Sequence, residues 1–80
     1  MSIDDATKDL QAKISAVSAG AQMKVVNMSD EEARITVLAA AADIQKIKDA
    51  TFQPAMDLLM KDGFDIQIFV YDKDAPPLSG

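Results

Sequence analysis

Bulky apolar residues occupy every second position in a segment near the C-terminal end, and this alternation constrains the fold more than any other feature. Residues 64–71 read Phe-Asp-Ile-Gln-Ile-Phe-Val-Tyr, which places Phe64, Ile66, Ile68 and Val70 on one side. Because side chains of a strand point alternately to the two faces of a sheet, the pattern predicts a strand with one buried face. A lone strand is not stable, so the chain must supply further strands and a helical layer to cover that face.

The N-terminal segment has the period of a helix. Its apolar residues recur at steps of three and four and form one stripe: Ile3, Ala6, Leu10, Ile14 and Val17. Ser2 followed three residues later by Asp5 matches a capping box, which marks the start of a helix. Gly20 is placed to end this helix, because glycine adopts the left-handed conformation that often follows a last helical turn.

Two more strands are predicted between residues 23 and 39. Residues 23–28 are short and β-branched and read as the first of them. The next four residues, Ser-Asp-Glu-Glu, have two interpretations: a turn before a second strand at residues 33–39, or a capping box that opens a long helix. The run Ile35-Thr36-Val37 favours the strand, because consecutive β-branched residues destabilise a helix and suit a sheet.

The region from Ala40 to Lys61 has helical character and contains a proline. Pro54 has no N–H to donate to the preceding turn, so we predict two helices. The first would end near Thr51, and the second would carry Pro54 in its first turn. Gly63 is placed to end the second helix.

These segments predict an α+β fold in the order α-β-β-α-α-β, with a three-stranded sheet and the helices packed on one face. The link between the second and third strands is long enough for a crossover, which allows those two strands to be parallel. Residues 1–72 would form one small domain, and residues 73–80 a flexible C-terminal tail that contains proline.

This order of elements resembles that of type II KH domains, BolA-like proteins and the C-terminal domain of NifU-like scaffolds. The resemblance is one of topology, since the chain has no Gly-x-x-Gly between its helices, no histidine and no Cys-x-x-Cys. A shared fold does not imply a shared function, so no functional residue of those families is carried over to this sequence.

Missing residue types exclude many kinds of active site. The 80 residues include no Cys and no His, which removes thiolate chemistry, disulfides and histidine-based acid–base or metal sites. Two carboxylate pairs are candidates for such a site, Asp62 with Asp65 and Asp72 with Asp74, but a helix end and a flexible tail account for them. We therefore predict no catalytic residue, no metal site and no cofactor, and we expect a protein that is not an enzyme.

Charge and hydropathy limit the partners and the location. Thirteen acidic residues against eight basic ones give a net charge of −5. A surface that is negative overall repels nucleic acid, so binding of nucleic acid across the whole surface is disfavoured. The N-terminus lacks the basic and apolar regions of a signal peptide, and no apolar run is long enough to cross a bilayer. The expectation is a soluble, cytoplasmic protein with no membrane partner.

Two surfaces remain as candidate binding sites. Around Pro54, polar residues fill only one stripe of the predicted helix, so Phe52, Met56 and Met60 offer apolar contacts to another molecule. The outward face of the sheet carries Phe69 and Tyr71. We predict that the protein is a small acidic adaptor or regulatory protein that binds a protein partner through these five residues, and a homodimer is one form of this hypothesis.

The outward face also supports an alternative function. Lys24, Arg34, Phe69 and Tyr71 would combine cations with aromatic rings, as surfaces that bind single-stranded nucleic acid or a small ligand do. A plainer interpretation is that Phe69 and Tyr71 only form cross-strand pairs and that the helical stripe belongs to the core. The positions of these side chains in the fold bear on all three interpretations.

Overall fold

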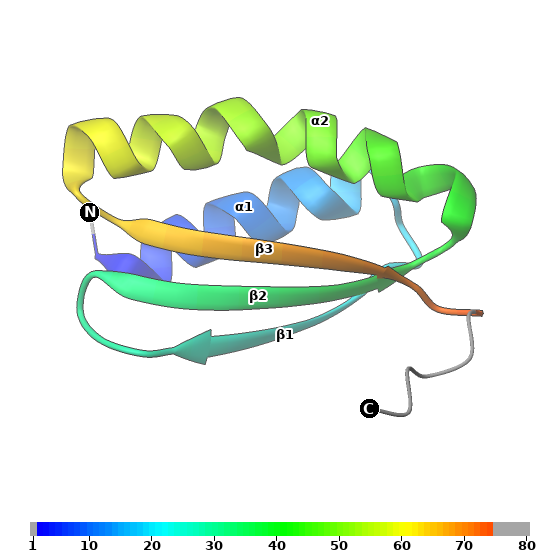
Figure 1. Ribbon diagram of the computed structural model, residues 1–80, viewed down its shortest axis with the longest axis horizontal. Helices are drawn as coiled ribbons and strands as arrows, with labels where there is room; N and C mark the ends of the chain where they lie inside the picture. The colour runs from blue at the N-terminus through cyan, green and yellow to red at the C-terminus, as the bar shows by residue number, and fades with distance from the viewer. Residues whose placement is uncertain (1, 75–80) are drawn as a thin grey trace.

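Two helices cover one face of a three-stranded sheet in the computed structural model, which describes residues 2–74 (Figure 1). The elements follow in the order α1 (Ile3–Val17), β1 (Gln22–Asn27), β2 (Glu32–Ala39), α2 (Ala41–Asp57), the π-helix η1 (Leu58–Asp62) and β3 (Asp65–Asp72). The predicted α+β class is confirmed. Most of the predicted tail, residues 75–80, lies outside the described residues.

The sheet has the strand order β1-β2-β3, with β1 and β2 antiparallel and β2 and β3 parallel. The predicted hairpin and the crossover through α2 are therefore confirmed, and the alternative of a long helix from residue 29 is wrong. Ser29 belongs to the hairpin turn, where its hydroxyl oxygen accepts hydrogen bonds from the backbone N–H groups of Glu31 and Glu32 at 3.2 and 3.0 Å.

Helix α1 begins at the predicted capping box. The Ser2 hydroxyl oxygen accepts a hydrogen bond from the Asp5 N–H at 3.2 Å, and the Asp5 carboxylate accepts one from the Ser2 N–H at 3.4 Å. Two of the N–H groups that a helix start leaves without partners are satisfied in this way.

The end of α1 differs from the prediction. The helix stops at Val17, whose side chain is exposed, so the buried stripe ends one turn earlier at Ile14. Gly20 has no positive φ and does not cap the helix. Ser18 forms the end instead: its N–H donates to the Ile14 carbonyl oxygen and its hydroxyl donates to Asp43 in the first turn of α2, both at 2.9 Å.

Pro54 does not divide the helical region, so the prediction of two helices separated between residues 51 and 54 is wrong. Helix α2 runs from Ala41 to Asp57 with Pro54 inside it and continues directly into η1 (Figure 1). Buried residues lie on both sides of the proline, with Ile47 and Thr51 before it and Leu58 after it. Packing of both ends against the core outweighs the hydrogen bond that the proline removes.

Gly63 ends the helical region as predicted. Its φ of 71° lies in the left-handed region, and its N–H and that of Phe64 donate to the carbonyl oxygens of Leu59 and Leu58 at 3.2 and 3.1 Å. This sharp reversal directs the chain into β3.

We expect Gly63→Ala to lower the free energy of unfolding by roughly 1–2 kcal/mol, because an L-residue is strained at positive φ. A Cβ atom at this position would meet nothing within 4 Å, so the loss would measure backbone strain alone. Gly20→Ala is the matched control, since it has equal space and no positive φ. Denaturant unfolding of both variants checks this, and equal stability losses would contradict it.

The core lies between the helical layer and the sheet. Its largest fully buried side chains come from α1, β2 and α2: Leu10, Ile14, Ile35, Val37 and Ile47. Helix α1 contacts β1 and β2, whereas α2 packs beside α1 and over β3. Because β3 is also the last strand of the sheet, one side of the α2–β3 layer has no neighbouring element within the described residues.

Candidate protein-binding groove at the β3 edge

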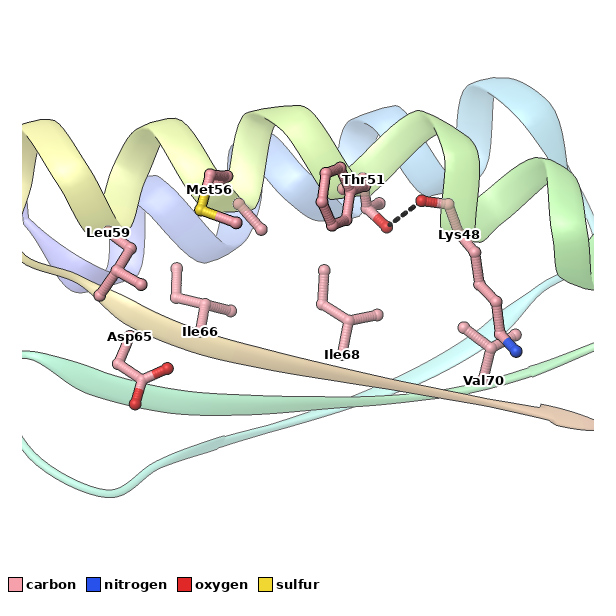
Figure 2. A pocket seen from close by; sticks show the side chains of 10 residues that line it. Lys48, Thr51, Met56, Leu59, Asp65, Ile66, Ile68 and Val70 are labelled. Atoms are coloured by element: carbon pink, nitrogen blue, oxygen red, sulfur yellow. Dashed lines mark hydrogen bonds between the residues drawn. The ribbon is translucent and has the colours of Figure 1, made fainter.

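An apolar groove of about 410 Å³ lies between α2 and β3 on this open side (Figure 2). The helical wall is formed mainly by Phe52, Met56 and Leu59. The strand contributes the side chains of its helix-facing residues, namely Ile66, Ile68 and Val70. The volume falls within the range of about 300–1,000 Å³ that is typical of ligand pockets.

Large apolar side chains are exposed along this groove. Phe52 is 65% exposed, and Met56 and Leu59 are also exposed. Ile68 and Val70 pack against the core but remain half-buried, because no further strand or helix of the described chain covers their outer sides. Contiguous exposed apolar patches are uncommon on soluble proteins, and they often mark sites that bind another molecule.

The groove contains few polar groups, and its centre is lined by apolar side chains. The Thr51 hydroxyl donates to the Ile47 carbonyl oxygen at 2.8 Å, within α2. Lys48 and Asp65 lie at opposite ends of the groove, and the Asp65 carboxylate turns away from α2 (Figure 2). The groove therefore suits apolar side chains and offers charged groups only near its ends.

The backbone of β3 adds a row of hydrogen-bonding groups beside the groove. The N–H groups of Asp65 and Lys73 donate to β2-side carbonyl oxygens, those of Glu31 and Ala39, at 2.8 and 2.9 Å. Because backbone groups of a strand point alternately to its two sides, the N–H and C=O groups of even-numbered residues point to the free edge. Ile66, Ile68 and Val70 thus present an apolar side chain to the groove, and at the free edge their backbone groups have no partner among residues 2–74.

The other edge of the sheet is better protected. Strand β1 is shorter than β3, carries Lys24 near its middle, and ends at Asn27, whose amide donates to the Asp4 carboxylate at 2.8 Å. Strand β3 has no charged residue between Asp65 and Asp72. Charges and short strands are the usual devices that keep an edge from pairing, whereas β3 is longer than β1 and carries charged residues only at its two ends.

The structure divides the five residues that the sequence predicts to bind a partner. Phe52 and Met56 line the groove. Met60 is 77% exposed but does not line the groove. Leu59, one residue earlier, contributes the side chain to the groove at this end of the helical wall. At 3.6 residues per turn, a step of seven residues from Phe52 returns to within about 20° of its direction, whereas a step of eight deviates by about 80°.

Phe69 and Tyr71 lie on the opposite face of the sheet and are exposed there. The Arg34 guanidinium carbon lies 5.4 Å from the centroid of the Phe69 ring, a distance at which a cation and a ring attract each other. Lys24 pairs with Thr36, which in turn pairs with Phe69, so these residues form one row across the sheet. The alternative site of two cations and two aromatic residues is thus gathered on one surface, separate from the groove.

Carboxylates do not gather elsewhere in the part of the chain that the structure describes. Within residues 2–74, no three Asp or Glu side chains are close enough together to hold a metal ion. The Asp72 carboxylate accepts a hydrogen bond from the Asp74 N–H at 2.9 Å. This bond stabilises a turn, which explains why these two acidic residues lie close together. None of the helices between residues 2 and 74 is long and apolar enough to cross a membrane.

No protein-family model matches the chain, and neither a curated protein nor a solved structure is significantly similar to it.

Proposed function

We propose that the protein is a non-catalytic binding protein whose groove and β3 edge together hold an extended segment of a protein. The observation that carries this proposal is the coincidence of two features at one place. Exposed apolar side chains of α2 and η1 flank a strand edge whose backbone groups have no partner within the described residues. Addition of a strand to such an edge is a common mode of peptide recognition.

The β3 edge and the groove would contribute different parts of the recognition. Main-chain hydrogen bonds to Ile66, Ile68 and Val70 would fix the direction and register of the bound segment. Its alternate side chains would enter the groove beside Phe52, where burial of a large apolar side chain contributes about 1.5–3 kcal/mol.

A peptide library displayed on phage tests this proposal. We expect the selected peptides to share apolar residues at every second position, because only one side of an added strand faces the groove. In NMR titrations with a selected synthetic peptide, the amide signals of Ile66, Ile68 and Val70 should shift most. Shifts concentrated at Lys24, Arg34 and Tyr71 on the outward face would contradict it.

A second candidate function rests on the position of Arg34 over the Phe69 ring, with Lys24 in the same row as Phe69. We propose that this face would bind single-stranded nucleic acid by stacking and by phosphate contacts, which weaken as salt increases. Fluorescence anisotropy of a labelled oligothymidylate tests it. The second function requires salt-dependent binding that Arg34→Ala reduces, and the absence of such binding at low salt would rule it out.

A further inference from the structure

We infer that the segment that pairs with β3 is β3 of a second copy of this chain, antiparallel and with Phe69 opposite Phe69. This inference rests on the proposed function and names the partner for the same groove and edge. Three features of β3 support it: the direction of its backbone groups, the placement of its charges and the position of Phe52 beside its centre.

The backbone groups of β3 are compatible with this pairing. In an antiparallel pair, opposite residues either exchange two hydrogen bonds or exchange none. With Phe69 at the centre, Ile68 lies opposite Val70 and Ile66 lies opposite Asp72, and all of these residues direct their N–H and C=O groups to the free edge. Every outward-pointing backbone group from Ile66 to Asp72 would then have a partner.

The charges at the ends of β3 select this register. With Phe69 opposite Phe69, Asp65 of each copy lies opposite Lys73 of the other, so two opposite-charge pairs form by symmetry. Lys73 is the first residue after β3, and its N–H donates to the Ala39 carbonyl oxygen at 2.9 Å, which holds it beside the end of β2. A register centred on Ile68 would instead place Lys73 opposite Gly63 and Asp65 opposite Tyr71.

The same symmetry brings the exposed helical side chains together. A two-fold axis that is perpendicular to the sheet and passes between the two opposed Phe69 residues places both α2 helices on one face of a six-stranded sheet. Figure 2 shows Thr51 over Ile68, and the next residue, Phe52, lines the groove. Phe52 therefore lies near the axis, where the two copies of this exposed side chain would meet. A specific interface of this kind has to bury about 1,000 Å² or more in total, so the helical side chains must contribute to it beside the paired strands.

Reversal of the two end charges tests the inference. Asp65→Lys would place two lysines opposite each other at both ends, and Lys73→Asp would do the same with two aspartates. We expect each variant alone to dimerise about tenfold or more weakly than the natural chain in sedimentation equilibrium. An equimolar mixture of the two variants should recover dimerisation. At one end of the mixed interface the introduced lysine faces the introduced aspartate, and at the other end the natural Lys73 faces the natural Asp65.

A second pair of variants controls for the change in net charge. Asp9→Lys and Lys8→Asp alter the net charge by the same two units on exposed positions of α1, away from β3. Each control variant should dimerise like the natural chain, alone and mixed. Recovery in the mixture of residue 65 and 73 variants, without a change in the control pair, supports the inference.

Two results would overturn the inference. A natural chain that stays monomeric at every concentration would exclude the second copy as the partner, and the selected peptides would still decide whether the groove binds a protein segment. A dimer that responds equally to the control variants and to those at residues 65 and 73 would exclude this register. Selected peptides that bind away from the groove would instead contradict the proposed function itself.

Discussion

Phe52→Asp is expected to abolish binding at the groove while the chain stays folded. Phe52 is 65% exposed, so the charge is hydrated in the free protein and costs little stability. In the complex, the carboxylate would be buried among apolar side chains without a partner. We expect the affinity for a selected peptide, and for a second copy, to fall about 30-fold or more, which corresponds to a loss of about 2 kcal/mol at a hot spot.

Met60→Asp is the matched control for this variant. Met60 lies in the same helical region and is 77% exposed, but it does not line the groove. Isothermal titration calorimetry with a selected peptide, beside thermal unfolding, compares the two variants. Equal losses of affinity in both variants would show that the whole helical surface, and not the groove, makes the contact.

Ile47→Ala is expected to have the largest effect on stability. The Ile47 side chain is 0% exposed and lies in α2 where the helix packs onto the core. Truncation of such a side chain removes its buried area and leaves a cavity, so we expect a loss of about 2–5 kcal/mol in the free energy of unfolding.

Leu59→Ala provides the contrast, because Leu59 belongs to the groove and is exposed. Its truncation should cost less than about 1 kcal/mol in the isolated chain, since little buried area is lost. Denaturant unfolding at a concentration below that of any self-association measures both variants. A large loss for Leu59→Ala would place the groove wall in the core and would remove the basis for a binding site there.

Local patterns in the sequence predict most of the fold because they report local physical preferences. The alternation around Ile66 and Ile68 indicated a strand, the Ser2–Asp5 capping box marked a helix start, and the run at Ile35 favoured the hairpin over a helix. Each of these signals concerns the conformation or the exposed side of a short segment. Each is confirmed by the structure.

The continuity of α2 was not predictable in the same way. Pro54 carries a local penalty, and a local rule therefore separates the helix at this residue. The buried residues Thr51 and Leu58 hold the two sides of the proline against the same core. Long-range packing of this kind depends on the assembled layers and leaves no signal in a short window of sequence.

The groove was only half predictable for a related reason. Phe52 and Met56 were identifiable from the sequence because the helix around Pro54 has more apolar surface than one sheet face can cover. It assigned Ile68 and Val70 to the core, since nothing in their alternation shows that β3 is the last strand of the sheet. An edge is a property of strand order, which depends on the crossover through α2 and not on the strand itself.

Hydrogen exchange at the backbone of β3 tests the central claim most directly, because neighbouring residues provide their own controls. The N–H groups of Gln67 and Phe69 point to β2 and should exchange slowly in every condition. Those of Ile66, Ile68 and Val70 point to the free edge and should exchange rapidly in dilute protein. We predict that these three become protected at high protein concentration or with a selected peptide, whereas rapid exchange of all three in both conditions would contradict a paired β3 edge.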